Sequence, residues 1–153
     1  MYAVGGVYGL NALRTVERYD PVKNEWQGVP KMKHSRRACS AAAMHQKIYV
    51  MGGFSLAKSM NDCERYSLDK QKWESIASMS QARSGCCSAG ANGNVYVFGG
   101  GVNNAKEENG ENVWAFNSGE KYDPITDKWS DIAEMKHTRR GAMAATIGGK
   151  IYV

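Results

Sequence analysis

The sequence predicts an all-β fold, an arc of about three four-stranded antiparallel blades of an incomplete β-propeller, and three observations lead to this prediction. A phrase of one tyrosine, two apolar residues and two glycines occupies residues 2–6, 49–53 and 96–100, and it returns in part at 151–153. Short segments of strand-forming residues fill each repeat. No segment keeps a helical period over three turns. Self-similarity at this spacing indicates one structural unit repeated along the chain.

Other residue types recur in step with this phrase. In each repeat a tyrosine precedes a tryptophan by seven residues, a methionine follows the tryptophan by six, and an arginine follows the methionine by four. These residues are Tyr19, Trp26, Met32 and Arg36, then Tyr66, Trp73, Met79 and Arg83, and then Tyr122, Trp129, Met135 and Arg139. The same spacing in three copies indicates that these positions have roles common to every repeat.

Residues 36–80 show what one repeat builds. Residues 40–44 are small and apolar, 47–51 are rich in β-branched and aromatic side chains, and 63–67 and 73–76 alternate apolar with polar side chains. Each segment has the length and composition of a strand bounded by turn residues. The repeat therefore predicts a four-stranded antiparallel meander.

Such a sheet has two partly apolar faces, so it must pack against neighbours, and radial stacking of four-stranded sheets gives a β-propeller. The expected first strands, at residues 40–43, 86–90 and 142–145, are rich in small residues, which suits strands crowded around a central channel. We expect the diglycines to mark places where a Cβ atom would be blocked. The wedges between blades are expected to hold the repeated Trp and Met side chains and the tyrosines, including Tyr2, Tyr49, Tyr96 and Tyr152.

This pattern resembles the kelch repeat: a diglycine closes the second strand, a tyrosine lies in the third, a tryptophan opens the fourth, and Met-x-x-x-Arg leads into the next blade. Residues 17–21 with Trp26, and residues 32–37, are most similar to the repeats of BTB-kelch (kelch-like) proteins. The resemblance covers essentially the whole chain and implies a kelch-type propeller. It implies function only broadly, because propellers host many activities.

The repeats divide the chain into four parts. We expect a partial blade at residues 1–35, a blade at 36–82, a blade at 83–138 with a long loop at 101–119, and a partial blade at 139–153. Propellers have roughly four to eight blades, so the chain is expected to be a fragment of a longer protein. Because an unclosed arc exposes apolar flanks, we expect the chain alone to aggregate, dimerise or stay partly unfolded.

Composition excludes several classes of protein. No apolar run approaches the length of a membrane span and no signal-peptide pattern occurs, so neither membrane insertion nor secretion is expected. Lysine and arginine are spread over turns, and the net charge of +5 does not indicate nucleic-acid binding. The four cysteines lack paired spacing, so we expect free thiols in the reducing cytoplasm, with a redox-sensing role as the alternative; they are Cys39, Cys63, Cys86 and Cys87.

The repeated arginines are the first candidate binding residues. Arg36, Arg83 and Arg139 share one repeat position, so they are expected on one face of the propeller, and Arg37 and Arg140 add charge there. Guanidinium groups hold carboxylates in a two-pronged fork. In BTB-kelch relatives this position supplies arginines that hold acidic peptide segments of the substrate. The resemblance therefore implies that these arginines bind an acidic segment of a protein partner. The alternative is that each arginine bonds to loop carbonyls of its own blade. If the arginines instead bind a partner, replacing Arg36, Arg83 and Arg139 with Glu should abolish partner binding and leave the melting temperature nearly unchanged.

The loop after each diglycine is the second candidate. It spans residues 7–16 and 54–63 in two repeats, but 101–119 in the third, where the extra residues include Lys106, Glu107, Glu108 and Glu111. Long insertions on one face of a propeller often carry function.

Aromatic side chains in these loops are also candidate partner-binding residues. Trp114 and Phe116 lie in the long loop, and tryptophan is a favoured hot-spot residue at interfaces. Tyr8 and Phe54 follow the first two diglycines and are expected on the same face. The alternative for Trp114 is that it folds back on its own blade.

Catalysis finds little support in this sequence. The chain has three histidines and lacks a nucleophile elbow, a phosphate-binding loop and metal-ligand spacing, so we expect no enzyme activity, cofactor or metal site. The leading hypothesis is a cytoplasmic protein-interaction module that binds an acidic segment of a protein partner. The resemblance implies the substrate-recognition part of a BTB-kelch adaptor of a cullin-RING ubiquitin ligase, with BTB and BACK domains upstream; an actin-binding kelch protein is the alternative, and a catalytic kelch protein a third class.

Overall fold

Two complete four-stranded antiparallel sheets form the centre of the protein in a computed structural model that describes residues 1–102 and 114–153. The first sheet has the strand order β11-β10-β7-β6 and the second has the order β12-β13-β14-β15. Their strands are β6 (Ser40–Met44), β7 (Lys47–Met51), β10 (Cys63–Ser67), β11 (Lys72–Ile76), β12 (Ser84–Ala91), β13 (Asn94–Gly101), β14 (Gly119–Asp123) and β15 (Lys128–Ile132). These strands confirm the meander predicted from the repeats.

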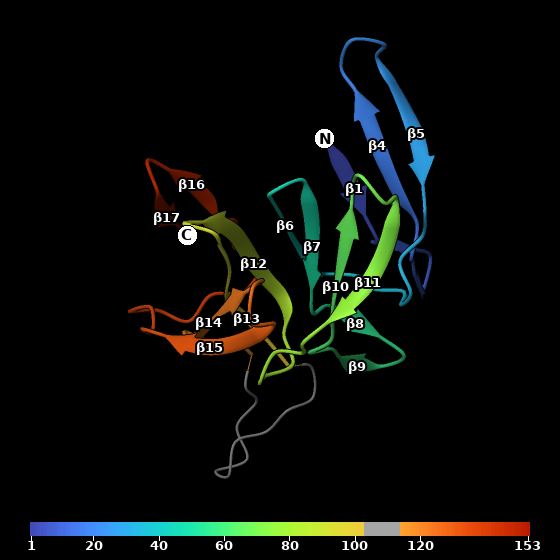
Figure 1. The fold of residues 1–153 in the computed structure, drawn as a ribbon. Helices are drawn as coiled ribbons and strands as arrows, with labels where there is room; N and C mark the ends of the chain where they lie inside the picture. Colours follow the sequence, from blue (N-terminus) through green and yellow to red (C-terminus); the bar gives the residue numbers. More distant parts are fainter. Residues whose placement is uncertain (103–113) are drawn as a thin grey trace.

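Partial sheets flank the two complete ones (Figure 1). The N-terminal sheet has three strands in the order β1-β4-β5, the C-terminal sheet pairs β16 with β17, and two short hairpins follow the first two diglycines. Their bounds are β1 (Tyr2–Val4), β4 (Val16–Asp20), β5 (Glu25–Val29), β16 (Ala145–Ile147), β17 (Lys150–Tyr152), β2 (Val7–Tyr8), β3 (Asn11–Ala12), β8 (Phe54–Ser55) and β9 (Lys58–Ser59). The described residues contain no helix long and apolar enough to cross a membrane.

The sheets stack side by side along an arc, with β6, β12 and β16 on its inner side and β5 and β11 on its outer side (Figure 1). Backbone hydrogen bonds connect β12 with the segments that precede β6 and β16, from the Gly85 amide to the Ala38 carbonyl and from the Gly141 amide to the Gly85 carbonyl, each 2.8 Å long. The expected all-β propeller arc is therefore confirmed. The last inner strand starts later than predicted, at Ala145, and forms three ladder pairs with β17.

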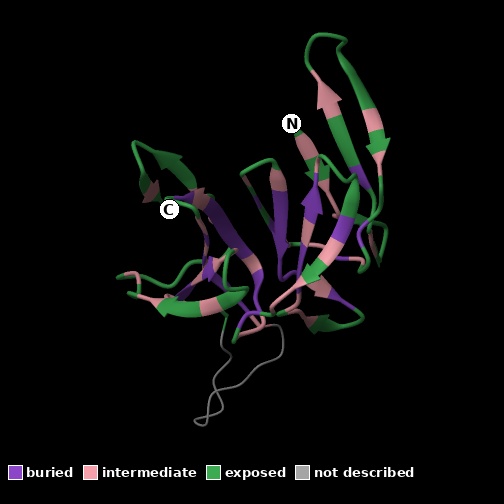
Figure 2. Cartoon of the chain, viewed as in Figure 1, coloured by how far each residue is buried: buried purple, intermediate pink, exposed green. Residues whose placement is uncertain are grey.

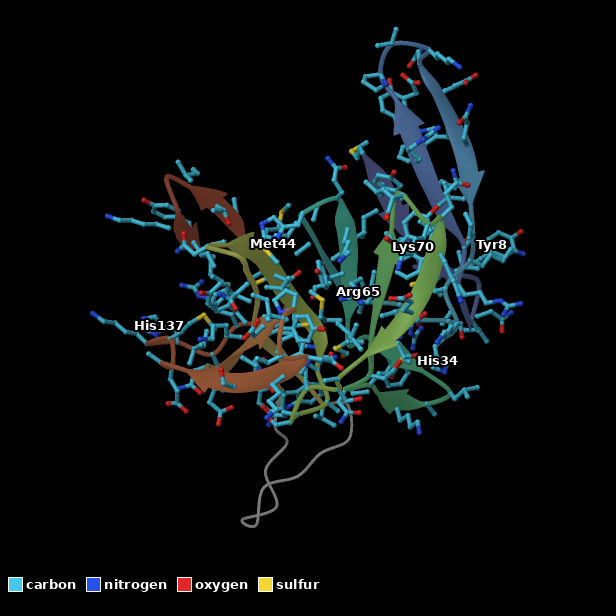
Figure 3. The ribbon with its side chains drawn as sticks, in the orientation of Figure 1. Tyr8, His34, Met44, Arg65, Lys70 and His137 are labelled. Atoms are coloured by element: carbon cyan, nitrogen blue, oxygen red, sulfur yellow. The ribbon has the colours of Figure 1, made fainter. Side chains whose placement is uncertain are left out.

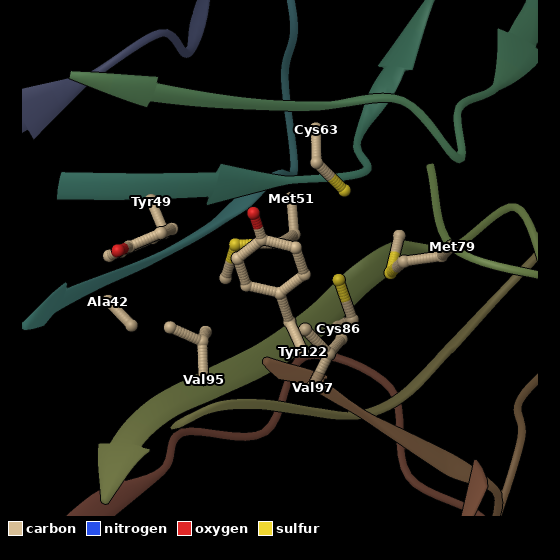
Figure 4. Packing of buried hydrophobic residues seen from close by; sticks show 9 residues of the cluster. All are labelled: Ala42, Tyr49, Met51, Cys63, Met79, Cys86, Val95, Val97 and Tyr122. Atoms are coloured by element: carbon tan, nitrogen blue, oxygen red, sulfur yellow. The ribbon is translucent and has the colours of Figure 1, made fainter. Parts of the chain in front are cut away.

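Apolar side chains fill the wedges between neighbouring sheets. Between the two complete blades, Tyr49 and Met51 of β7 face Val97 of β13 and Tyr122 of β14 (Figure 4). A second cluster joins the N-terminal sheet to the next blade. Its buried members are Val16, Met32, Ile48, Val50, Tyr66 and Trp73. Each wedge thus draws its side chains from two successive repeats.

Tryptophan fixes each wedge with one hydrogen bond. The Trp73 indole donates to the Pro30 carbonyl and the Trp129 indole to the Ala77 carbonyl, both at 2.7 Å. At the ends of the arc the expected core residues are exposed: Trp26 is 46% exposed and Tyr152 57%. The expectation of burial was wrong there because, among the described residues, no neighbouring sheet covers them (Figure 2).

The diglycines have the conformation that their position predicted. Gly52 and Gly99 have φ angles of +59° and +61°, in the region that favours glycine. A Cβ atom on Gly52 would lie 2.3 Å from the Arg83 carbonyl oxygen, and one on Gly99 would lie 2.3 Å from that of Arg139. The second strand of each blade therefore touches the loop that leaves the same blade.

Candidate functional site

The guanidinium of Arg36 lies in a closed pocket of oxygen atoms from the following blade. Nη1 donates to the carbonyls of Gly52 at 2.7 Å and Asp62 at 3.0 Å. Nη2 donates to the carboxylates of Asp62 at 2.6 Å and Glu64 at 2.8 Å. The side chains of Arg36 and Glu64 are 0% exposed. The Arg36 amide donates to the Leu13 carbonyl at 2.8 Å and the Gly6 amide donates to the Arg36 carbonyl at 2.9 Å, so Arg36 joins the N-terminal sheet to the blade it enters.

Arg83 repeats this arrangement one blade later. Nη1 donates to the carbonyls of Gly99 at 2.8 Å and Ser118 at 3.1 Å, while Nη2 donates to Ser118 Oγ at 2.9 Å. Nε donates to Glu120 Oε1 at 3.2 Å, and both side chains are almost fully buried. The backbone of Arg83 bonds to the preceding blade, through its amide to the Met60 carbonyl at 3.0 Å and through its carbonyl to the Gly53 amide at 2.8 Å. The repeated arginine therefore links the preceding blade to the glutamate of the blade that it enters.

This burial corrects the expectation that Arg36 and Arg83 present a cation to a protein partner. Their donors are directed into the protein, and solvent does not reach them. Burial alone lowers the pKa of Arg36, but the carboxylates of Asp62 and Glu64 outweigh that effect and the pKa is raised. The charged form is thus retained inside the protein, as a structural ion pair. Arg139, at the same repeat position, has an exposed side chain.

The buried glutamates also fix the loop that carries the arginine. Glu64 accepts hydrogen bonds from the backbone amides of Lys33 at 2.7 Å and His34 at 3.1 Å. Glu120 accepts the equivalent bonds from Ser80 at 2.8 Å and Gln81 at 3.4 Å. Each glutamate therefore stabilises both the backbone and the cation of the preceding loop.

The same pocket includes a group of residues with metal-ligand chemistry. Ligand atoms of His34, Asp62 and Glu64 lie within 4.8 Å of one another. The guanidinium of Arg36 already contacts both carboxylates, so a positive charge occupies the place that a cation would take. His34 is about 30 positions from the two carboxylates, and sequence spacing could not reveal the group.

An open groove lies on the face formed by the loops after the diglycines. The hairpins β2–β3 and β8–β9 border a hollow of about 510 Å³ that also includes Arg37 and Phe54. Leu10 and Leu56, in the turns of the two hairpins, are 93% and 90% exposed. The guanidinium carbon of Arg37 lies 4.8 Å from the centroid of the Phe54 ring, a cation–π contact that orients the charge. We call these residues the hairpin groove.

A second hollow of about 430 Å³ continues the hairpin groove past Ser35 and Ser55, whose hydroxyl oxygens are 3.0 Å apart. His34 and Lys58 line this part. Figure 3 shows His34 near β8 and β9, and Tyr8, which is 80% exposed, further along the same side of the protein. The structure therefore places Tyr8, Phe54 and Arg37 of the predicted set on one side.

The other predicted residues gather in the following blade. Arg140 donates to Ser84 Oγ at 2.9 Å and to the Trp114 carbonyl at 3.3 Å, and the Trp114 side chain is 69% exposed. Phe116 is half-buried, with its ring centroid 5.4 Å from the guanidinium carbon of Arg83. The charged residues expected in the long loop lie outside the described residues; they are Lys106, Glu107, Glu108 and Glu111.

The hairpin leucines were not predicted. Leu10 and Leu56 do not share a repeat position, so the lockstep pattern passes over them. The available signal was an apolar residue within a turn segment, where polar residues are usual.

The cysteines have the environment of inert thiols. Burial raises the pKa of Cys39 to about 11 and that of Cys63 to about 12. Cys86 and Cys87 are also buried, and burial raises their pKa values. Since the thiolate is the reactive form, these sites favour the expected free thiols over a redox sensor.

A family model described as the Kelch motif matches residues 1–33, 35–80 and 82–136. The chain belongs to the kelch-repeat family. Over 51 residues it is 37% identical to Kelch-like protein 35 from Mus musculus, a match that covers 33% of this chain and 9% of that protein. The solved structure of YjhT superposes with a TM-score of 0.67 at 24% identity, covering 80% of this kelch chain and 35% of that one. This last likeness shows the kelch propeller fold. The chain spans about a third of the length of the YjhT chain. Kelch repeats indicate a protein-interaction module.

Proposed function

We propose that this kelch chain recognises a protein partner through the hairpin groove, without catalysing a reaction. The exposed pair of Leu10 and Leu56 around Arg37 is the observation that carries the proposal. Exposed apolar side chains beside an oriented cation are typical of an interaction site. The partner segment that fits is short and combines an apolar side chain with a carboxylate.

The charge in this site comes from Arg37, which replaces Arg36 and Arg83 in that role. Arg37 is partly exposed, and its contact with Phe54 holds the guanidinium over the groove. An exposed ion pair contributes about 0–1 kcal/mol, so the carboxylate serves mainly to select the partner. Most of the affinity then comes from apolar contacts with Leu10, Leu56 and Phe54.

We further propose that the chain is the substrate-recognition part of a cytoplasmic BTB-kelch adaptor of a cullin-RING ubiquitin ligase. The match to Kelch-like protein 35 and the BTB-kelch character of residues 17–21 and 32–37 support this step. Sequencing of the full transcript tests it. A BTB domain encoded ahead of residue 1 is the expected result, and a transcript without one contradicts the adaptor role.

A displayed library of random peptides tests the hairpin groove. Selection on the immobilised chain is expected to enrich peptides with Asp or Glu next to an apolar residue. Arg37→Glu should weaken binding of the selected peptides about tenfold, because it places a like charge opposite their carboxylate. Fluorescence anisotropy with labelled peptides measures this change.

Lys70→Glu is the matched control, with the same change of charge. Lys70 lies in the turn between β10 and β11, at the other end of the blade from His34 (Figure 3), and its replacement should leave peptide affinity unchanged. Peptides enriched without acidic residues, or equal binding by Arg37→Glu and the parent chain, would contradict the proposal. If the parent chain and the Arg37→Glu variant cosediment equally with actin filaments, a cytoskeletal role is favoured instead.

A further inference from the structure

The second hollow brings hydroxyl groups and cationic side chains together beside the hairpin groove. It has a volume of about 430 Å³, and its lining includes His34, Ser35, Ser55 and Lys58. Ser35, Ser55 and Leu56 line both this hollow and the hairpin groove. A single bound segment can therefore reach from one hollow into the other.

The β8–β9 hairpin fixes Lys58 beside the hydroxyl groups. Ser55 and Lys58 are Cα partners in the ladder, so their side chains lie on the same face of the hairpin. Ser35 Oγ lies 3.0 Å from Ser55 Oγ, which ties the loop before Arg36 to that face. The turn residues Leu56 and Ala57 have φ angles of +47° and +62°, as a tight two-residue hairpin turn requires. The hairpin thus holds Lys58 opposite the pair of serines.

Lys58 carries a charge that the described part of the protein does not pair. Its side chain is exposed, and no carboxylate within residues 1–102 and 114–153 forms an ion pair with it. Lys33, in the neighbouring loop, instead donates to Ser75 Oγ at 3.0 Å. An exposed ammonium group on a short hairpin, next to hydroxyl donors, is suited to binding an anion.

His34, which lies near the same hairpin (Figure 3), supplies a second cation when its Nε2 is protonated. Its Nδ1 lies 3.2 Å from Asp62 Oδ2 and 3.6 Å from Glu64 Oε1, so Nε2 is the nitrogen left for a ligand. Arg36 Nη2 already donates to Asp62 at 2.6 Å and to Glu64 at 2.8 Å. Arg36 and protonated His34 then balance the two carboxylates, and the charge of Lys58 remains for an anion.

The fold of a blade does not require this set of side chains. The following blade keeps the buried ion pair between arginine and glutamate but replaces three of the residues around the second hollow. The repeat positions of His34, Ser35 and Asp62 are occupied there by Gln81, Ala82 and Ser118. Polar loop residues that the architecture does not need are candidates for binding a ligand.

We propose that the second hollow binds a phosphorylated side chain of the partner segment whose acidic and apolar residues lie in the hairpin groove. This inference rests on the proposed function, because the hairpin groove holds the rest of the segment. Lys58 Nζ and His34 Nε2 supply the positive charge, and the hydroxyls of Ser35 and Ser55 turn to donate to the phosphate oxygens. A phosphate has more charge than a carboxylate and three strong acceptor oxygens, which matches a hollow with several donors.

Synthetic peptides test this inference by fluorescence anisotropy with the 153-residue chain. Each peptide has an Asp-Leu core for the hairpin groove and one serine at a different distance from that core, made with and without a phosphate on the serine. At one distance the phosphorylated peptide is expected to bind about tenfold more tightly than the unmodified peptide. A glutamate in place of that serine should recover only a small part of the gain, because it has less charge and fewer acceptor oxygens.

Variants of the chain locate the phosphate. Lys58→Gln should remove most of the gain and leave the affinity for the unmodified peptide within about twofold of the parent value. Lys70→Gln, with the same change of charge, should keep the full gain. His34→Gln installs the residue that the following blade has at this position, so it should reduce the gain and preserve the fold. Inorganic phosphate should compete with the phosphorylated peptide and spare the unmodified one.

The outcomes separate this inference from the proposed function. If unmodified peptides bind and a phosphate adds nothing at any distance, the inference alone is overturned. A gain that both Lys58→Gln and His34→Gln retain would place the phosphate elsewhere on the protein and would also overturn it. Equal competition by inorganic phosphate against both forms of the peptide would show a general effect of salt and would count against the hollow. If the chain binds neither form of any peptide, both proposals fail.

Discussion

Replacing Arg36 with methionine is expected to lower the free energy of unfolding by about 3–5 kcal/mol, because it leaves the buried carboxylate of Glu64 without its cation. Methionine keeps most of the side-chain volume, so the loss reports the charge and its hydrogen bonds. The amides of Lys33 and His34 still donate to Glu64 in the variant. The expected loss in the free energy of unfolding is therefore close to the lower end of this range. Urea unfolding at neutral pH measures the change.

Arg14→Met is the control for this experiment. Arg14 is an exposed arginine, and its replacement should alter the free energy of unfolding by less than about 0.5 kcal/mol. Equal losses in the two variants would show that the pocket around Arg36 contributes no special stability. The earlier expectation, that charge reversal at Arg36 and Arg83 spares stability, is abandoned because both side chains are buried.

Gly52→Ala is expected to cost about 1–3 kcal/mol more than Gly9→Ala, because only the first places a methyl group against backbone. The two glycines have φ angles of +59° and +58°, so alanine meets the same conformational penalty at both positions. The new Cβ of Gly52→Ala would lie 2.3 Å from the Arg83 carbonyl, whereas no atom lies within 4 Å at Gly9. The difference therefore isolates the close contact.

Thermal unfolding followed by circular dichroism measures both glycine variants. Gly52→Ala should also disturb the loop that carries Arg83, because the Gly53 amide bonds to the same Arg83 carbonyl. Equal melting temperatures for the two variants would mean that the blade can shift away from the loop at no cost.

Lockstep repetition made the strands and wedges predictable. The four strands expected in residues 36–80 are present as β6, β7, β10 and β11, since one pattern seen in three copies overrides the weak preference of any short segment. The rings of Tyr66 and Trp73 and those of Tyr122 and Trp129 have centroid distances of 5.1 and 5.2 Å, as expected of repeated core positions. At the ends of the arc the same pattern predicted burial wrongly, since Trp26 and Tyr152 are exposed.

The direction of the arginines could not be predicted from position alone. A repeated arginine in a loop fits a partner-binding face as well as a bond to the next blade, and the carboxylates that Arg36 contacts lie 26 and 28 residues away in sequence. One signal was available: a glutamate recurs as regularly as the arginine, at Glu17, Glu64 and Glu120. Two opposite charges that recur in step are the pattern of an internal pair.

The location of each ion pair has a consequence for cooperativity. The side chain of each arginine pairs with a glutamate of the blade that follows it, whereas its backbone amide and carbonyl bond to the preceding blade. The buried ion pair therefore keeps its native position only while both blades are folded, and losing one blade risks leaving a buried charge unpaired. The smallest stable unit of this protein is then a boundary between two blades, and a blade that opens exposes its neighbour to the same penalty. The stability of a repeat protein is approximately the sum of the intrinsic stability of each repeat and the interaction energy between neighbouring repeats. In this protein the buried ion pairs increase the share that comes from the interaction between neighbouring blades.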